Sequence, residues 1–356
     1  MTLTWKIVIG GSLVSLVCVL IKRKKQKNVD SSQQTEHDEV YTNIDAYTNM
    51  DTSTSDSEES CGVCCSKFIE STDCMLQKQF EQTCACYIEY DKPVLRFNMN
   101  FKIIQCIKDL SEQDCSCAIV EKAGKVVGVI DTIDIVNFLM CYEGLDLCKT
   151  LKQCVRKMVI VYNTSNLMEV AKYLRCGFRY IIVSNSNKDY SIISQGSMLR
   201  YIFSNRDFLE QDSVFKESLR NLRICSEKKL VTISCNECVT DAFNLMLKMD
   251  ITSIPLVDST GKCVSVMSMS DIKCVASIDL IEIDSVLKIS CLNFVKFARE
   301  QLNKHSFSHI ISCSMDESLE NVMQTMTDYD IHHIYILDEG VAVNVVSYVD
   351  IIKTLF

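Results

Sequence analysis

The sequence predicts an α/β fold made of four tandem repeats, each consisting of a helix, two strands and a second helix. The first observation is a set of four apolar stripes at the spacing i, i+3, i+4 and i+7, which places the residues on one face of a helix. The stripes are Ile103, Cys106, Ile107 and Leu110; Leu167, Val170, Ala171 and Leu174; Val239, Ala242, Phe243 and Met246; and Leu319, Val322, Met323 and Met326. Such a recurrence indicates a repeat architecture.

Two further observations complete the repeat. Each stripe is followed by two short β-branched runs separated by a polar turn, which predicts a pair of strands. In three copies an aspartate then opens the second helix, 31 or 32 residues after the first stripe residue: Asp134, Asp271 and Asp350. The second copy has Ser197 there. An aspartate at a helix start can act as an N-cap without any ligand, so each has a structural interpretation beside a binding one.

Length and composition indicate a globular protein. A chain of 356 residues with 47% hydrophobic residues can bury a sizeable core, and we expect two domains. The formal charge of −9 argues against nucleic acid as a partner, which needs clustered Lys and Arg. Several of the 21 cysteines fall inside helix and strand patterns, where we expect small buried apolar residues with free thiols: Cys106, Cys117, Cys176, Cys263 and Cys274.

Residues 1–28 are predicted to be a transmembrane anchor with a basic flank. Residues 7–21 carry no charge, and Trp5 lies at their outer edge, as an interfacial aromatic would. The basic residues that follow, Lys22, Arg23, Lys24, Lys25 and Lys27, predict that the rest of the chain faces the cytosol. Such a short anchor suits the mitochondrial outer membrane or the endoplasmic reticulum. A cleaved signal peptide and a buried helix are the alternatives.

The remainder divides into a linker and a folded region. Residues 29–60 are polar and acidic without periodicity, which predicts a disordered linker. We expect a first pair of repeats in residues 61–205, divided near residue 145, and a second pair in residues 206–356, divided near residue 280.

A group of cysteines opens the folded region: Cys61, Cys64, Cys65, Cys74, Cys84 and Cys86. Their spacing is irregular for zinc, which usually takes two well-spaced pairs and often a histidine. We interpret them as reduced thiols, with lipidation near a membrane and zinc as the alternatives.

Motifs in the third and fourth copies resemble a known family. The segment Asp250-Ile-Thr-Ser-Ile-Pro-Leu-Val-Asp258 is followed by a turn at Gly261 and by residues 264–271. The segment Asp330-Ile-His-His-Ile-Tyr-Ile-Leu-Asp338 is followed by residues 345–350. On these motifs the chain resembles the CBS-domain family, and more closely the gamma regulatory subunit of AMP-activated protein kinase. Residues 68–74 and 215–224 look like that subunit's entry segment and the bridge between its second and third repeats, so the likeness covers residues 65–356.

The resemblance implies two CBS pairs (Bateman modules) in a disc with nucleotide clefts near its centre. A carboxylate can accept both ribose hydroxyls of an adenine nucleotide, and basic side chains hold its phosphates. The implied ribose ligands are Asp134, Asp271 and Asp350. Strand hydroxyls would come from Ser268 and Ser347, and adenine-edge contacts from Thr252 and Ser318. Phosphate contacts would come from Arg179, His332 and His333.

The chain departs from the family pattern at positions expected to be basic. Ser116 and His333 stand where arginines are expected, and Gly196 with Ser197 replaces a basic pair. In the first repeat Asp131 and Ile133 replace hydroxyl residues, and Asp131 would repel a phosphate. We therefore expect weaker binding of AMP, ADP or ATP than is usual in the family, strongest in the third and fourth repeats.

The resulting prediction is a non-catalytic regulatory subunit without a cofactor or metal, because no catalytic or phosphate-loop motif is present in the sequence. The resemblance implies a protein kinase alpha subunit and a beta scaffold subunit as partners. The alternatives are a degenerate, membrane-tethered CBS scaffold that binds no nucleotide, and a regulator of a membrane transporter.

Overall fold

The computed structural model describes residues 3–9, 12–18, 75–88, 94–141, 148–185, 189–205, 213–224, 230–302 and 310–356. The chain divides into two units, residues 1–60 and residues 61–356, which are described separately. The second unit contains all four repeats. The linker predicted at residues 29–60 and the entry segment at residues 68–74 lie outside the described residues.

Each repeat is a strand, a helix, a hairpin of two strands and a second helix. The first comprises β3 (Arg96–Asn98), α3 (Ile103–Glu112), β4 (Cys117–Lys122), β5 (Lys125–Asp131) and α4 (Thr132–Cys141). The second comprises β6 (Val159–Tyr162), α5 (Leu167–Arg175), β7 (Tyr180–Ser184), β8 (Tyr190–Ser194) and α6 (Gln195–Ser204). The third comprises β9 (Ile233–Ser234), α7 (Val239–Lys248), β10 (Ser253–Val257), β11 (Cys263–Ser268) and the 3-10 helix η6 (Met269–Ser277). The fourth comprises β12 (Ser312–Cys313), α10 (Leu319–Asp328), β13 (His333–Asp338), β14 (Val341–Ser347) and α11 (Tyr348–Leu355).

The four sheets share one topology. The first strand pairs parallel with the second, which pairs antiparallel with the third. The predicted order of helix, strand, strand and helix is confirmed. The first strand of each repeat was not predicted. Two of these strands, β9 and β12, have only two residues each and are too short to show an alternating pattern.

The apolar stripes form the base of the folded core. All sixteen stripe residues are at most 1% exposed, and burial of a Leu, Ile or Phe side chain contributes about 1.5–3 kcal/mol. After each stripe helix the chain turns through a residue with positive φ: Asp114 (45°), Gly177 (94°), Asp250 (50°) and Asp330 (46°). Glycine and aspartate tolerate this left-handed conformation, so the helix ends at the same point in every repeat.

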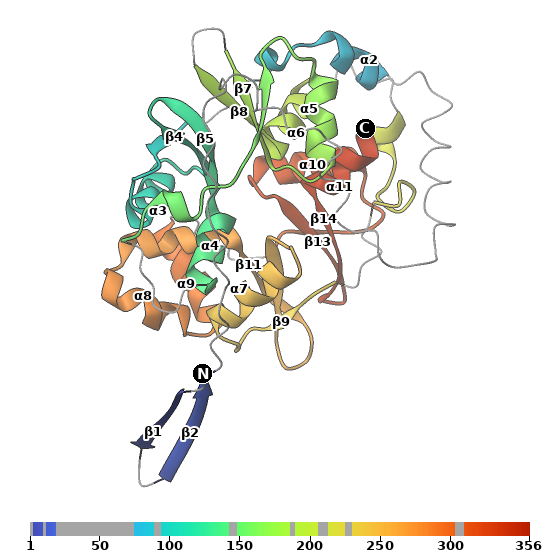
Figure 1. The fold of residues 1–356 in the computed structure, drawn as a ribbon. Helices are drawn as coiled ribbons and strands as arrows, with labels where there is room; N and C mark the ends of the chain where they lie inside the picture. The colour runs from blue at the N-terminus through green and yellow to red at the C-terminus, as the bar shows by residue number, and fades with distance from the viewer. Residues whose placement is uncertain are drawn as a thin grey trace. The chain divides into compact units, whose positions relative to one another are not determined.

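The repeats contact one another through helices and through sheets. One hydrophobic core joins the first and third repeats, where α3 and α4 pack on η6, and a second joins the second and fourth repeats, where α10 and α11 pack on α6. Figure 1 shows these two groups of helices, with the hairpins β4–β5, β7–β8 and β13–β14 around them. A smaller core between sheets joins the first and second repeats through Ile119 and Ile182.

The remaining elements connect and cover the repeats: α2 (Met75–Gln82), η2 (Ala85–Tyr87), η3 (Leu151–Gln153), η5 (Ser213–Lys216), α8 (Leu280–Leu287) and α9 (Cys291–Gln301). In α2, Leu76 and Phe80 belong to the core of the second and fourth repeats, and the Phe80 ring lies 4.8 Å from that of Phe356. The bridge at residues 215–224 buries Phe215, Leu219 and Ile224 in the same core.

The transmembrane helix predicted in residues 1–28 does not appear. The structure instead has two strands, β1 (Leu3–Ile9) and β2 (Ser12–Cys18), paired antiparallel with Ile9 opposite Ser12. The sequence reason is the Gly10-Gly11 pair between two β-branched runs, a hairpin signal that the prediction overlooked. Within the described ranges, no helix is both long enough and apolar enough to cross a membrane. The membrane and the cytosolic orientation stay predictions.

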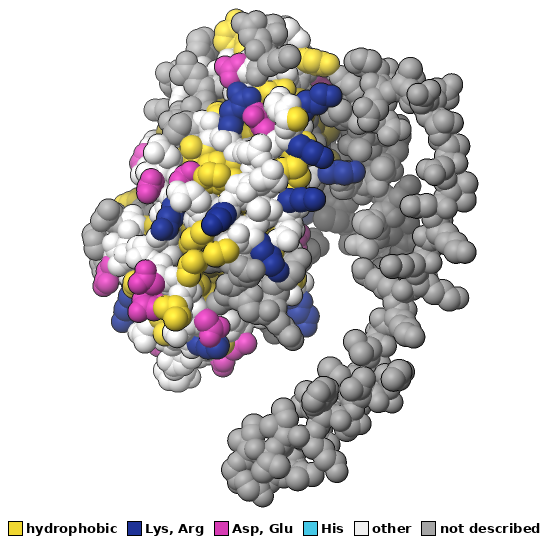
Figure 2. Space-filling model, turned by 60° about the vertical axis from the view of Figure 1, so that its left-hand side comes forward, with side chains coloured by type: hydrophobic (Ala, Val, Ile, Leu, Met, Phe, Trp, Pro, Cys, Tyr) yellow, Lys and Arg dark blue, Asp and Glu magenta, His cyan; other side chains and the backbone are white. Residues whose placement is uncertain are grey.

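The cysteine predictions are only partly confirmed. Cys106, Cys117 and Cys274 are buried, but Cys263 is half-buried and Cys176 is exposed. Cys176 follows the last turn of α5, just before the turn at Gly177, where the chain faces solvent. In the described part of residues 61–356, every cysteine is a free thiol. Figure 2 shows one face of the molecule, on which Lys and Arg side chains alternate with hydrophobic and acidic ones.

Candidate functional site

A reciprocal pair of hydrogen bonds opens the second helix of every repeat. The backbone N–H of the residue before the helix donates to a side chain three positions later. In chain order the acceptors are Asp134 (2.9 Å), Ser197 (2.8 Å), Asp271 (2.7 Å) and Asp350 (2.8 Å). This is a capping box. Each aspartate therefore takes part in capping its helix, but it is not the N-cap residue. The N-cap residue lies three positions before it.

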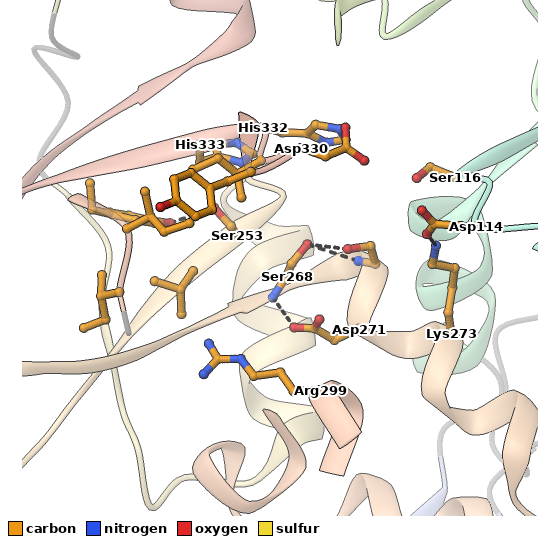
Figure 3. Close-up of a pocket in the computed structure, with 17 residues that line it drawn as sticks. Asp114, Ser116, Ser253, Ser268, Asp271, Lys273, Arg299, Asp330, His332 and His333 are labelled. Carbon is orange, nitrogen blue, oxygen red and sulfur yellow. Dashed lines mark hydrogen bonds and ion pairs between the residues drawn. The ribbon is translucent and has the colours of Figure 1, made fainter. Parts of the chain in front are cut away.

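A cavity of about 180 Å³ lies between the third and fourth repeats. Its apolar wall is formed by Val266, Ile310, Ile311 and Ile331. Ser268 and Asp271 lie at the end of β11 and the start of η6, and Figure 3 shows them between Arg299 on one side and Lys273 with Asp114 on the other. A base can pack on the apolar wall while a ribose meets the carboxylate.

The hydroxyl and carboxylate groups of this cavity are ordered by hydrogen bonds. The Ser268 hydroxyl lies 2.9 Å from that of Ser270 and accepts from its backbone N–H at 3.2 Å. On the fourth-repeat side, the hydroxyls of Ser253 and Tyr335 are 2.7 Å apart and buried. These bonds orient the polar groups that line the cavity.

Two basic residues of this cavity were missed by the sequence analysis. Lys273 is only 3% exposed, and its Nζ donates to Asp114 Oδ1 at 3.2 Å and to the Cys115 carbonyl at 3.3 Å. Arg299, on α9, donates from Nη2 to Ser265 Oγ at 3.1 Å. Burial lowers the pKa of Arg299, and the charge of Asp271 opposes this effect. Neither residue lies in a recognised motif, and Arg299 comes from the connection between the repeats.

The two histidines predicted to bind phosphate behave differently. Both line the cavity, and His332 is exposed. His333 Nε2 lies 3.1 Å from Thr252 Oγ1, and burial, followed by the charge of His332, lowers the pKa of His333 to about 3. His333 is therefore neutral at physiological pH and supplies a hydrogen bond but no positive charge.

In the first repeat, the residue before the second helix is Asp131, and two arginines of the chain itself bind its carboxylate. Asp131, 1% exposed, accepts through Oδ2 from Arg156 at 2.8 Å and from Arg179 at 2.9 and 3.1 Å. Its Oδ1 accepts the backbone N–H groups of Ile133 and Asp134 at 2.9 and 3.0 Å. Burial alone would raise the pKa of Asp131, but Arg179 and Arg156 lower it. Asp131 was expected to repel a phosphate. In the structure its carboxylate is instead paired with Arg156 and Arg179.

Asp134 shares this cluster. Arg156 lies 3.5 Å from it, yet burial and then the charge of Asp131 raise the pKa of Asp134 to about 8. Arg156 approaches closely because Gly128 lies opposite: a Cβ there would lie 2.4 Å from the Arg156 carbonyl oxygen. Asp134 is therefore mostly protonated at neutral pH, which makes it a poor acceptor for two ribose hydroxyls.

The structure brings some of the predicted site residues together and separates others. Ser268, Asp271, His332 and His333 line the cavity of about 180 Å³. Arg179 and His332 line an adjoining cavity of about 80 Å³. Thr252 reaches the first cavity only through His333. The remaining four line neither cavity: Asp134, Ser318, Ser347 and Asp350. Ser318 is the N-cap of α10, and Ser347 with Asp350 caps α11.

The described residues contain no cluster of His, Cys, Asp or Glu that could hold a metal ion. Cys84 is half-buried and Cys86 is exposed, while Cys61, Cys64, Cys65 and Cys74 lie outside the described residues.

Comparison with known proteins agrees with this architecture. The CBS domain family model matches residues 224–276 and 306–356, which are the third and fourth repeats. The solved structure of protein MJ1225 from Methanocaldococcus jannaschii, described as a proposed archaeal homologue of gamma-AMPK, superposes with a TM-score of 0.62 at 15% identity. A conserved protein from Pyrococcus horikoshii gives 0.50 at 15% identity, and each alignment covers 77% of this chain and 100% of the other. At these identities the likeness shows the fold.

Curated relatives match part of the chain. The 5'-AMP-activated protein kinase subunit gamma of Kluyveromyces lactis is 23% identical over 168 residues, which is 46% of this chain and 47% of that protein. Protein SDS23 of Candida albicans is 25% identical over 183 residues, 50% of this chain and 28% of that protein. The chain thus aligns with less than half the length of these relatives.

The third and fourth repeats therefore match the CBS domain family, and the first and second repeats have the same topology. Among such proteins, this chain resembles the gamma subunit of AMP-activated protein kinase.

Proposed function

We propose that this chain is a non-catalytic regulatory subunit that binds an adenine nucleoside or nucleotide between its third and fourth repeats. One observation carries the proposal: the carboxylate of Asp271 and the hydroxyl of Ser268 line the same cavity as an apolar wall. An ionised carboxylate accepts the two hydroxyl donors of a ribose, and the apolar wall accepts the base. Asp271 is the best placed of the three predicted aspartates, since Asp134 is held in the ion cluster and Asp350 lines neither described cavity.

We extend the proposal to a protein kinase as the regulated partner. Its support is the resemblance to the gamma subunit of Kluyveromyces lactis, together with the fold shared with the archaeal protein. A kinase catalytic subunit and a scaffold subunit would then assemble with the four repeats. Purification of the tagged full chain from its native cells should recover a protein kinase in stoichiometric amount, and recovery of a membrane transporter instead would contradict this part of the proposal.

The second candidate is a CBS scaffold without a nucleotide. Two observations favour it. In the first repeat Asp131 binds Arg156 and Arg179, and His333 is neutral, so both features remove positive charge that a phosphate would need. The two candidates differ in one measurable property, the binding of a nucleoside to the full chain.

The matched variants Asp271→Asn and Asp350→Asn separate the candidates. Each keeps an oxygen that can accept the capping hydrogen bond, but only Asp271 lines the cavity. In calorimetry with AMP we expect D271N to lose about tenfold or more in affinity, because a hydrogen bond to a charged group contributes about 1.5–3 kcal/mol. D350N should bind as the wild type does. Loss in D350N alone would move the site to the fourth repeat, and no binding to the wild type would favour the scaffold.

A further inference from the structure

Two segments of the first pair of repeats, residues 94–103 and 148–157, lie side by side. Three backbone hydrogen bonds of 2.9–3.0 Å join them, and Lys102 lies opposite Thr150 in a short antiparallel bridge. The first segment contains β3 and the start of α3, and the second contains η3 and leads from the first repeat to the second. Residues far apart in the sequence therefore share one surface.

This shared surface is positively charged. The two segments contain no Asp or Glu, and their basic residues are Arg96, Lys102, Lys149, Lys152, Arg156 and Lys157. The whole chain has a formal charge of −9, so this local excess runs against the composition. Both arginines are neutralised within the fold, Arg96 by Glu121 and Arg156 by Asp131. The remaining positive charge is carried by lysines.

Three of these lysines, Lys102, Lys152 and Lys157, are exposed and are called the lysine surface below. Among the described residues, none of the three has a carboxylate partner. None of them lines either of the two described cavities. Their charge is therefore presented to the solvent on an open part of the first repeat and its connection.

The chemistry of the lysine surface favours an extended anionic partner over a compact one. A compact anion such as a single phosphate is held best by planar guanidinium groups, or by polar groups that converge in a cavity. Here the arginines already have partners, and the lysines lie outside the described cavities. Lysine is a point charge on a flexible stem. An anionic lipid bilayer presents many headgroups at once and attracts each lysine that comes near it.

We propose that the lysine surface docks the first repeat on an anionic lipid bilayer. The contact is electrostatic and does not depend on the nucleotide site proposed above. A chain with a charge of −9 is repelled as a whole by such a bilayer. The lysine surface therefore determines which side of the four repeats approaches the lipid.

Vesicle partitioning of the full chain tests this inference. The probes are vesicles of phosphatidylcholine with about one-third phosphatidylserine and vesicles of phosphatidylcholine alone, and the quantity measured is the ratio of the two partition coefficients. The wild type should prefer the anionic vesicles. The triple variant K102Q/K152Q/K157Q should lower the ratio about a hundredfold, because each lysine near an anionic surface contributes about fivefold. Raising the ionic strength from about 0.1 M to about 0.5 M should remove most of the wild-type preference.

Three lysines elsewhere provide a matched control. Lys172, Lys248 and Lys353 are exposed and lie in the last turns of α5, α7 and α11. The variant K172Q/K248Q/K353Q has the same net charge as the first variant but keeps the lysine surface, so its ratio should stay within about fivefold of the wild type. Both variants keep the basic residues in positions 22–27, so any binding by that segment is common to all three proteins. The affinity for AMP should be the same in all three.

Equal ratios in the wild type and K102Q/K152Q/K157Q would overturn the inference, as would a wild type without a preference for anionic vesicles. Equal losses in the two triple variants would reveal a general effect of net charge and would also overturn it. A wild type that binds a short DNA duplex but not the anionic vesicles would assign the surface to nucleic acid instead. Should the triple variant misfold by circular dichroism, the three single variants decide, each with an expected loss of about fivefold.

Discussion

The first and third repeats have the same backbone plan but differ at the residue that begins the second helix. In the third repeat this residue is Ser268, which bonds locally to Ser270, and a cavity remains beside Asp271. In the first repeat it is Asp131, whose second oxygen binds Arg156 and Arg179. The second and fourth repeats have serines, Ser194 and Ser347, at this position.

This difference shows that one added carboxylate can turn a potential ligand site into an internal ion cluster. A serine N-cap satisfies the helix and leaves nearby arginines available to a ligand, whereas an aspartate satisfies the helix and also binds the arginines. Arg179, predicted to bind phosphate, instead has an internal anion as its partner 48 positions away in the chain. The first repeat then has an internal ion cluster, and the third repeat keeps an open cavity.

The largest effect is expected from Asp131→Ser, which gives the first repeat the cap residue of the other three. The serine keeps the cap but leaves Arg156 and Arg179 without their shared carboxylate. Breaking a buried ion pair costs about 3–5 kcal/mol, and we expect the lower end because the arginine side chains are 41% and 25% exposed. Urea unfolding measures the loss.

Added phosphate provides the control for D131S. The released arginines should bind it, so phosphate should restore part of the lost stability in D131S and have a smaller effect on the wild type. A D131S protein as stable as the wild type would show that the cluster does not stabilise the first repeat.

The next effect concerns pH and Asp134, whose pKa is raised from 3.8 to about 8 by burial and by the charge of Asp131. The folded state then binds more protons than the unfolded state between these values. The stability that this gives is present below about pH 4 and is lost as the pH rises through about 8. The wild type should therefore lose stability relative to Asp134→Asn across this range, by at most about 1.4 kcal/mol per pH unit. Parallel curves for the two proteins in urea unfolding would contradict the shift.

The smallest effect is expected from Ser318→Ala. Ser318 Oγ accepts the backbone N–H of Asn321 at 3.2 Å and caps α10. Its loss should cost about 1 kcal/mol and leave AMP affinity unchanged, in contrast to the adenine contact implied by the family resemblance. A weaker AMP affinity in S318A, measured by calorimetry, would show that Ser318 contacts the ligand and would contradict this prediction.

The sequence predicted those features that depend on neighbours a few positions away. The i, i+3, i+4, i+7 stripe of Ile103, Cys106, Ile107 and Leu110 predicted a helix, and all four side chains are fully buried. The spacing of Asp134, Asp271 and Asp350 likewise located the start of each second helix, because a capping box spans only three residues. The pairing of β1 with β2 also has a local signal in the sequence, the Gly10-Gly11 pair, whereas the uncharged run of residues 7–21 favours a helix.

Features that depend on partners distant in the sequence could not be predicted. The pairing of Lys273 with Asp114 spans 159 positions, and only the packing of the first repeat on the third creates it. The lowered pKa of His333 likewise depends on its surroundings in the folded chain, where Thr252 lies 81 positions away in the sequence.

The most direct test of the central claim is the stoichiometry and site of AMP binding to the full chain, measured by calorimetry on wild type, Asp134→Asn and Asp271→Asn. The account predicts one AMP per chain, with an affinity that is unchanged in D134N and about tenfold or more weaker in D271N. Binding that survives D271N but is lost in D134N would place the ligand in the first repeat and contradict the account.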